Sequence, residues 1–269
     1  NMGETQNRGF EISLNSAVID KKNFGLTLGF NISVNRSKII SLGEMSDFGV
    51  ASSWASTEIT NDYWVSKGGR VGQMYGYKSD GRYEVSDFSG HDEGSNTWTL
   101  KPGVVSDAGI IGTVRPGSMK LKDISGPNGT PDGTVTIADN TIIGDNNPKN
   151  IGGFSISGKV YDFDFSAIFS WSYGFDVYNA NKIAYTTGRY QFWNMTTEMA
   201  EGKRWNNLDA ATGTIVNDPA TLAAMNEKTT MWSPYMTRRV CSDWAMEDGS
   251  FLRLNTLSVG YNVPDALLK

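Results

Sequence analysis

The sequence has few of the residues on which most enzymes and metal proteins depend. Its 269 residues include one cysteine and one histidine. A single cysteine, Cys241, excludes an intramolecular disulfide framework, and His91 lies in "SGHDEGSN", a composition typical of a solvated loop. The sequence also lacks a Ser, His and Asp arrangement, zinc-ligand spacing and a phosphate-binding glycine loop followed by a helix. We therefore predict that the chain is not an enzyme.

Long apolar runs and clustered positive charge are also missing. No run approaches the roughly 18 consecutive apolar residues of a spanning helix, so any membrane span would have to be a β-strand. Charged residues make up 20% of the chain, the net charge is -5 and the pI is near 5.0. Phosphate contacts need clustered Lys and Arg, so the sequence predicts no nucleic-acid partner.

Strictly alternating segments are the most informative feature that is present. In "FGLTLGFNISVN", residues 24–35, apolar side chains share one side, and glycine and small polar residues share the other. At about 3.3 Å per residue such a strand reaches about 40 Å, longer than most globular strands. Residues 8–18, 153–160, 163–173 and 249–264 alternate in the same way. Residues 8–18 and 24–35 predict one hairpin with a tight turn, and residues 153–160 and 163–173 predict a second.

Very long polar connections separate these hairpins. Residues 36–150 and 174–249 predict only short elements: strands near 71–85 and 117–122, and helices near 177–185 and 219–226. Tight turns that alternate with long loops are characteristic of outer-membrane barrels. A secreted β-sandwich or a jelly roll would also combine alternating strands with polar loops.

Three details favour the barrel over these alternatives. The strands exceed sandwich length, Trp171 and Tyr173 end one apolar face as an aromatic girdle would, and the opposite face is small and polar. We predict that the Phe24–Val34 side meets lipid and that the side with Gly25 and Thr27 faces the lumen. The alternative function is that of a secreted, soluble glycan-binding β-sandwich.

Six segments, in order, resemble the SusC/RagA family of TonB-linked outer-membrane transporters. They are "NMGETQNRGFEISLN", "FGLTLGFNISVNRSKIISLG", "GQMYGYKSDGRYE", "TIIGDNNPKNIGGFSIS", "FDFSAIFSWSYGFDVYNANK" and "EDGSFLRLNTLSVGYNVP". The resemblance implies an all-β fold, an antiparallel transmembrane β-barrel portion with long extracellular loops. Residues 1–269 would be part of one 22-stranded barrel domain whose plug and final strands lie outside this chain.

The resemblance also implies a location and partners. The protein would lie in the outer membrane, in contact with its lipid, and import nutrient oligosaccharides or peptides. A SusD-like lipoprotein would form a lid over the barrel, and TonB would act through the missing N-terminal region. No cofactor is implied.

Aromatic residues in the long connections are the candidate substrate-binding residues. A flat ring can lie against a sugar while nearby polar groups bond its hydroxyls. We expect one or two members of this set to contact substrate, and the others to fold the loops or contact the lid protein. The candidates are Trp54, Trp64, Trp98, Trp193, Trp205 and Trp232.

An acidic loop at residues 123–140 is the only candidate metal site. "DISGPNGTPDGTVTIADN" is similar to an acidic loop of the same family that matches the first half of an EF-hand, with Asp123, Asp132 and Asp139 as candidate calcium ligands. Five residues intrude before Asp132, and Thr136 stands where a carboxylate is usual, whereas an EF-hand needs oxygens at fixed positions. Asp, Asn and Gly are also ordinary turn residues. We therefore favour a solvated turn, with calcium as the alternative.

Overall fold

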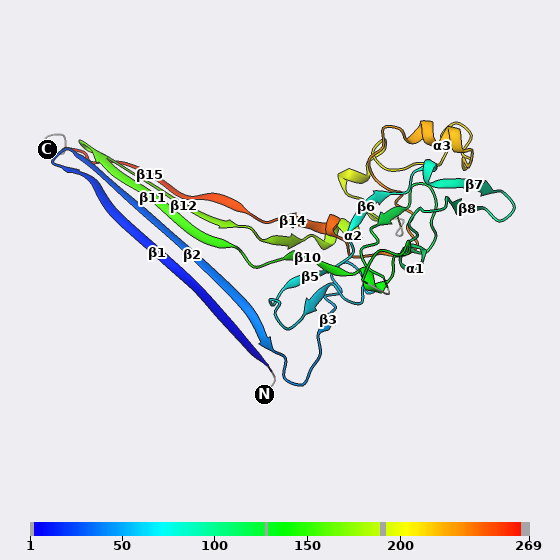
Figure 1. Cartoon of the computed structure of the whole chain (residues 1–269). Coiled ribbons are helices and arrows are strands. Elements are labelled where there is room, and N and C mark those ends of the chain that lie inside the picture. Colours follow the sequence, from blue (N-terminus) through cyan, green and yellow to red (C-terminus); the bar gives the residue numbers. More distant parts are fainter. Residues whose placement is uncertain (1–2, 127–128, 189–191, 265–269) are drawn as a thin grey trace.

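The structure, a computed structural model, describes residues 3–126, 129–188 and 192–264, and two regions make up the molecule (Figure 1). One is a single antiparallel sheet, here called the wall sheet. Its strand order is β1 (Glu4–Lys21), β2 (Phe24–Ser41), β11 (Asn150–Val160), β12 (Phe163–Tyr173) and β15 (Phe251–Tyr261). The other, here called the loop region, comprises the described parts of 42–149 and 174–250 and lies at the end of the sheet opposite the tight turns.

The wall sheet has one apolar and one polar face, as the alternation predicted. Residues directly opposite in neighbouring antiparallel strands share a face. Phe30 lies opposite Leu14 and Phe154, and Phe154 lies opposite Phe169. The next row on the other face joins Asn31 to Ser13 and Gly153. The apolar row therefore runs from strand to strand across the whole sheet.

The first hairpin is longer than predicted. β1 and β2 each have 18 residues, whereas the alternation indicated 8–18 and 24–35. Beyond residue 35 the polar "RSK" interrupts the pattern, and the extra length of β2 is held partly by the loop region. The Ile39 N–H donates to the Gly69 carbonyl (2.9 Å), and the Gly68 N–H donates to the Ile39 carbonyl (2.8 Å).

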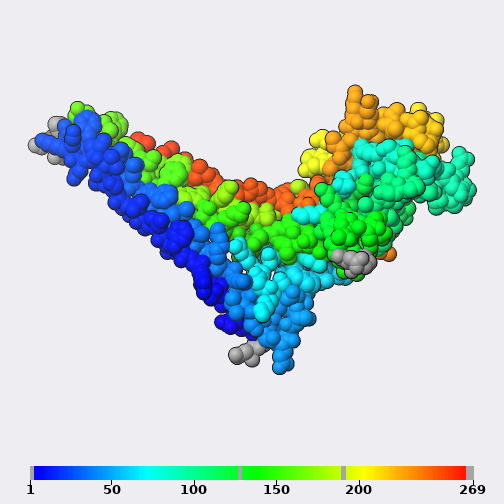
Figure 2. All heavy atoms as spheres, viewed as in Figure 1, coloured from blue at the N-terminus to red at the C-terminus, as the bar shows by residue number. Residues whose placement is uncertain are grey.

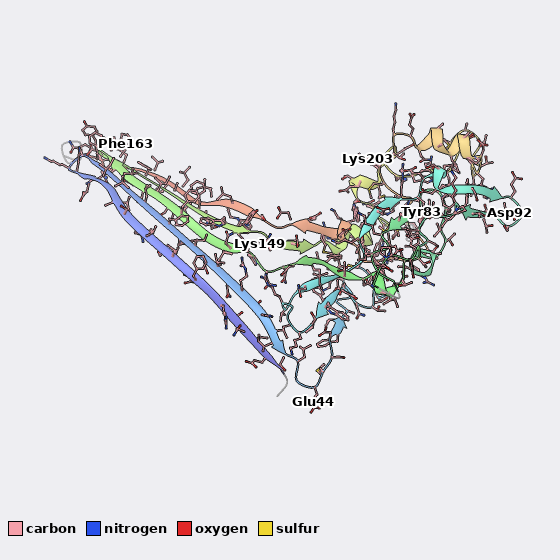
Figure 3. The ribbon with its side chains drawn as sticks, in the orientation of Figure 1. Glu44, Tyr83, Asp92, Lys149, Phe163 and Lys203 are labelled. Atoms are coloured by element: carbon pink, nitrogen blue, oxygen red, sulfur yellow. The ribbon has the colours of Figure 1, made fainter. Side chains whose placement is uncertain are left out.

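Aromatic side chains gather at both ends of the wall sheet. Near the loop region, Trp171 donates from Nε1 to Asn150 Oδ1 (2.9 Å), and its ring stacks on Phe30 with centroids 5.6 Å apart. At the tight turns, where Figure 3 labels Phe163, that ring lies 4.7 Å from Tyr261. Only the first of these two groups was predicted.

The edges of the wall sheet are open within the described residues. β1 pairs only with β2, and β15 pairs only with β12. Figure 2 shows this region as one thin layer beside the thicker loop region. The prediction of an all-β fold with antiparallel sheets is confirmed, and the sheet is unclosed in this chain. Among the described residues, no helix is long and apolar enough to cross a membrane.

The loop region contains short elements that the sequence predicted in part. A four-stranded sheet has the order β10 (Thr141–Asp145), β5 (Gln73–Gly76), β4 (Tyr63–Val65) and β3 (Phe48–Val50). Two-stranded pairs join β6 (Ser79–Arg82) to β9 (Met119–Leu121), β7 (Phe88–Asp92) to β8 (Thr97–Leu100), and β13 (Asp176–Tyr178) to β14 (Met246–Asp248). The helices are α1 (Ala108–Ile111), α2 (Ala180–Ala184) and α3 (Pro219–Asn226). The helix predicted near 177–185 is correct only for α2, because the segment begins as strand β13. β14 was not predicted, because a three-residue strand carries no visible periodicity.

The buried core lies in the loop region. One cluster surrounds Tyr83 and Leu121, which are fully buried, and a second surrounds Met74 and Tyr178. Figure 3 shows Tyr83 within the loop region, while Asp92 marks the tip of the β7–β8 hairpin. The long connections are therefore folded against one another as a globular unit.

Candidate functional site

The four-stranded sheet of the loop region presents different faces to the core and to a cavity. Met74 and the partly buried Tyr63 pack with the second core cluster. Trp64 and Tyr75 alternate with them along β4 and β5 and therefore point to the opposite face. Their rings stack with centroids 4.6 Å apart and an angle of 21° between the planes. The short strands thus hold the two rings face to face as one stacked aromatic pair.

A cavity of about 770 Å³, here called the loop cavity, opens beside this stacked pair. Small-molecule sites are typically about 300–1,000 Å³, with mainly apolar walls and a few polar groups. The residues that matter most for its chemistry are Trp64, Tyr75, Tyr77, Asn61, Asn140 and Arg238. Of the predicted tryptophans, only Trp64 lines the cavity.

The segment 237–241 forms another part of the wall of the loop cavity. Arg238 donates from Nη1 to the Gly109 carbonyl (3.1 Å), which ties this segment to α1. The Tyr77 N–H donates to the Cys241 carbonyl (3.0 Å). These bonds join parts of the chain more than 100 residues apart into one wall.

The charged groups of this wall are bonded within the protein. Glu58 Oε2 accepts the Arg239 N–H at 3.1 Å. The Arg239 guanidinium, which is buried, donates to Thr187 Oγ1 from Nη2 at 3.1 Å. The cavity therefore combines hydrogen-bonded charged groups with neutral amide groups.

Two tyrosines in the cavity wall remain neutral phenols at physiological pH. Burial raises the pKa of Tyr75. Burial also raises the pKa of Tyr77, against a hydrogen bond with Asn140 that lowers it. A neutral phenol can both donate and accept a hydrogen bond.

Three other predicted tryptophans lie outside the loop cavity. Trp54 is 66% exposed, with its ring 6.0 Å from that of Tyr63. Trp98, on β8, is partly buried and lies 4.9 Å from the His91 ring. Trp193 is 53% exposed. The structure does not bring these three side chains together, and their contact with substrate stays a prediction.

Trp205 and Trp232 are both buried in the loop region. The Arg82 guanidinium lies 4.8 Å from the centre of the Trp205 ring, and the Trp232 ring lies 4.8 Å from that of Trp244 in an edge-on arrangement. Their packing favours the role of folding the loops, which we expected for most of the set. A contact of either ring with substrate stays untested.

The acidic loop is organised by hydrogen bonds from its own backbone. Asp139 Oδ1 accepts the Ile124 and Ser125 N–H groups at 2.8 and 2.9 Å, and Oδ2 accepts the Thr136 N–H at 2.6 Å. Burial would raise the pKa of Asp139, but these bonds together hold it below its usual value. Asp123 Oδ2 accepts the Gly133 N–H at 2.6 Å.

Metal binding by this loop stays a prediction. Asp132 Oδ1 accepts the Thr134 N–H at 3.0 Å, as in an ordinary turn. Across the described ranges 3–126, 129–188 and 192–264, no group of three or more His, Cys, Asp or Glu side chains is placed to hold a metal ion. The observed bonds are those of a turn stabilised by carboxylates.

Sequence reasoning missed most of the cavity. Asn61, Asn140 and Arg238 were not predicted as site residues, because they lie far apart and belong to no recognisable motif. Tyr75 and Tyr77 alternate within a segment predicted to form strands, and this was the only available signal. The cavity exists because distant segments fold together, which a local pattern does not report.

Comparisons with known proteins agree with the resemblance seen in the sequence. No family model matches. The chain is 28% identical over 268 residues to TonB-dependent receptor P3 of Formosa agariphila, covering 100% of this chain and 23% of that protein. TonB-dependent receptor P26 of the same organism is 26% identical, with 98% and 23% covered.

Solved structures agree on the fold. A structure of the RagAB peptide transporter matches with a TM-score of 0.66 and 16% identity, covering 99% of this chain and 23% of that one. The chain spans about a quarter of the length of the proteins it matches. These relatives are receptors and transporters and not enzymes, in agreement with the prediction. Over its whole length, the chain is thus similar in sequence to TonB-dependent receptors and, as the SusC/RagA resemblance implied, it has a RagA-like fold.

Proposed function

We propose that this chain forms part of the wall and the extracellular loops of a TonB-dependent outer-membrane transporter for nutrient oligosaccharides or peptides. The observation that carries the proposal is the exposed apolar face of the wall sheet. Leu14 is 62% exposed, Leu257 is 67% exposed and Val259 is 73% exposed. A continuous apolar face of this size is unfavourable in water and is suited to lipid.

The dimensions of the wall sheet support a membrane span. β11, β12 and β15 have 11 residues each, and a tilted transmembrane strand needs about 9–11. Aromatic residues at both ends of the apolar face, including Trp171 and Phe163, fit the two membrane interfaces. A β-sandwich would cover this face with a second sheet, and none of the described strands does so.

The remaining parts of the transporter follow from the resemblance. Residues 1–269 are part of a single 22-stranded barrel domain, with the plug and the final strands elsewhere in the protein. Import is powered through TonB, which acts on the missing N-terminal region. A SusD-like lipoprotein covers the loop end and encloses the substrate. The RagAB proteins, named as a peptide importer and transporter, support nutrient import as the general activity.

Membrane fractionation of the full-length protein tests the proposed location. We expect the protein in the outer-membrane fraction, soluble only with detergent, and co-purified with a surface lipoprotein. A full-length product that is soluble and monodisperse without detergent would contradict the transporter and favour the secreted glycan-binding module.

Growth on defined nutrients tests transport. Deletion of the gene should abolish growth at low concentrations of one class of oligosaccharide or peptide, and loss of TonB should have the same effect. Growth on the corresponding monosaccharide or amino acids serves as the control. Uptake that persists without TonB would show that the proposed energy coupling is wrong.

A further inference from the structure

We propose that Arg8, Arg36 and Lys38, here called the basic cluster, bind the phosphate groups of outer-leaflet lipids beside the wall sheet. The proposal rests on the proposed function, because it needs the apolar face of the sheet to lie in lipid. The ligand is a component of the membrane and not an imported nutrient. Arg8 lies directly opposite Arg36 in the first hairpin, and in the next row on the same face Gln6 lies opposite Lys38.

The basic cluster continues the apolar face of the wall sheet towards the loop region, near the start of β1 (Figure 1). Phe10 lies opposite Val34 in the row before the two arginines, and residues two apart on a strand share a face. All three basic side chains are exposed. The apolar row that starts at Phe24 therefore ends at Val34, and the next side chains on that face are basic.

The basic cluster lies at the headgroup level in the proposed orientation. At about 3.4 Å per residue and a tilt of about 45°, residues 24–34 span about 24 Å across the membrane, close to the apolar band of about 25 Å in outer-membrane barrels. Arg36 follows two residues later, about 5 Å beyond this band. Its Nη1 donates to the Lys149 carbonyl at 2.7 Å, and the next residue, Asn150, accepts from the Trp171 indole. The guanidinium is therefore close to the aromatic group at this end of the sheet.

The basic cluster forms no ion pair with the residues that the structure describes. The ion pairs among these residues join side chains of the loop region. Glu11, on the same hairpin, accepts the Ser33 hydroxyl at 3.0 Å on the polar face. Like charges directly opposite each other in neighbouring strands are destabilising, so the pair of Arg8 and Arg36 needs an anion from outside these residues.

A lipid phosphate suits the basic cluster better than a soluble anion does. Guanidinium groups present forked N–H donors that match phosphate oxygens, and an ammonium group adds a point charge. Lys38 supplies this charge beside the loop region, since a Cβ atom at Gly68 would lie 3.8 Å from its Cε. A lipid places its phosphate at this level and its acyl chains against the apolar rows, whereas a soluble anion gains only the first contact.

Lipid titrations of the full-length protein test the basic cluster. The protein is purified from outer membranes and delipidated in detergent, and native mass spectrometry measures its dissociation constants for lipid A and for lipid A without phosphate groups. Inorganic phosphate is the soluble competitor. We expect lipid A to bind at least about tenfold more tightly than the dephosphorylated form. An equimolar amount of inorganic phosphate should not displace it.

Matched variants separate this site from a general effect of charge. The double change Arg8→Gln and Arg36→Gln should weaken lipid A binding at least about tenfold. Arg36→Lys keeps the charge but loses the forked donors, so it should weaken binding less. Lys21→Gln removes an exposed cation from the same face at the tight-turn end of β1, and it should bind as the wild type does. If the double variant does not assemble, Arg8→Gln alone decides the question.

The outcomes distinguish the basic cluster from the proposed function. Lipid A affinity that is unchanged in the double variant, or equal for the two forms of lipid A, would overturn the site. An equal loss in Lys21→Gln, or displacement by equimolar inorganic phosphate, would overturn it as well. TonB-dependent uptake by the wild type would in each case leave the transporter intact. A full-length protein outside the outer-membrane fraction would instead overturn the proposed function.

Discussion

The wall sheet and the loop region use the same kinds of residue in opposite ways. In the loop region Leu121 and Tyr83 are fully buried, whereas in the wall sheet Leu257 is 67% exposed and Tyr261 is 49% exposed. Burial of apolar area in water stabilises the first. The second pairs its inner strands on both sides and leaves its apolar face uncovered, as the proposed membrane location requires.

Polar residues show the same contrast. In the loop region, carboxylates such as Asp107 and Asp139 are fully buried and bonded to backbone N–H groups. In the wall sheet, small polar residues such as Ser166 and Ser258 lie opposite one another on the exposed polar face. A buried carboxylate needs bonds to offset its desolvation, whereas a polar wall facing water needs none. We therefore expect carboxyl groups with shifted pKa values in the loop region.

The largest expected effect tests which face of the wall sheet meets lipid. Leu28→Arg places a charge on the apolar face and should cost about 2–4 kcal/mol if this position lies near the bilayer midplane. Thr27→Arg, one residue away on the polar face, is the matched control and should assemble. Heat-modifiable migration of the full-length protein from outer membranes measures assembly. Equal yields of the two variants would show that the apolar face does not meet lipid.

The second effect is a change in the stability of the loop region with pH, caused by the titration of Asp107. Its Oδ1 accepts the Tyr83 hydroxyl at 2.8 Å and its Oδ2 accepts the Leu121 N–H at 3.0 Å. Burial raises the pKa of Asp107 to about 6, against these bonds, which lower it. Because the folded state holds the proton more tightly than the unfolded state, this group makes folding less favourable as pH rises from about 4 to about 6.

Above pH 6 this effect lowers the free energy of unfolding of the loop region by about 3 kcal/mol. Asp107→Asn removes the titration, so the loop region of this variant should lose less stability than the wild type between pH 4 and pH 6. Hydrogen exchange at the Leu121 amide, compared at these pH values in the assembled protein, measures the difference. Glu93→Gln, at an exposed position, is the control and should follow the wild type. Parallel pH profiles of Asp107→Asn and the wild type would contradict the assignment.

The sequence could predict the wall sheet because its information is local. A period of two over 11 or more residues specifies both faces, and residues such as Leu28 and Gly29 were placed correctly before any contact was known. Residues 36–41 of β2 escaped prediction because the alternation stops at residue 35. They are held by pairing with the start of β1 and by the bonds of Ile39 with Gly68 and Gly69. Even in the wall sheet, what was missed depended on distant residues.

The loop region could be predicted only in fragments. The predicted helix at 219–226 is present, and its start is set by local groups: Pro219 stands in its first turn, and the Asp218 carboxylate accepts the Thr221 N–H at 2.8 Å. Exposed Trp54 and buried Trp205 stand in equally polar sequence, so their difference in burial was invisible. The loop cavity was missed for the same reason, since its walls come from segments that meet only in the folded state.

A smaller effect tests close packing in the loop region. A Cβ atom at Gly76 would lie 2.5 Å from the Cys241 carbonyl oxygen, at the point where β5 meets the segment 240–242. Gly76→Ala should therefore destabilise the loop region by about 1–3 kcal/mol. Gly90→Ala is the matched control, because no atom lies within 4 Å of a Cβ at this strand position. Hydrogen exchange at the Tyr77 amide measures the loss, and equal protection in both variants would contradict it.

The smallest expected effect concerns divalent cations. Because Asp139 accepts three backbone N–H groups, we expect the acidic loop to be stable without calcium, so EDTA should leave the thermal midpoint of the detergent-purified protein unchanged. Asp139→Ala removes the buried acceptor of these three N–H groups and should lower the midpoint whether or not calcium is added. Glu93→Ala, at an exposed position outside this loop, is the control. A midpoint that rises with calcium in the wild type and not in Asp139→Ala would show that the loop is a cation site.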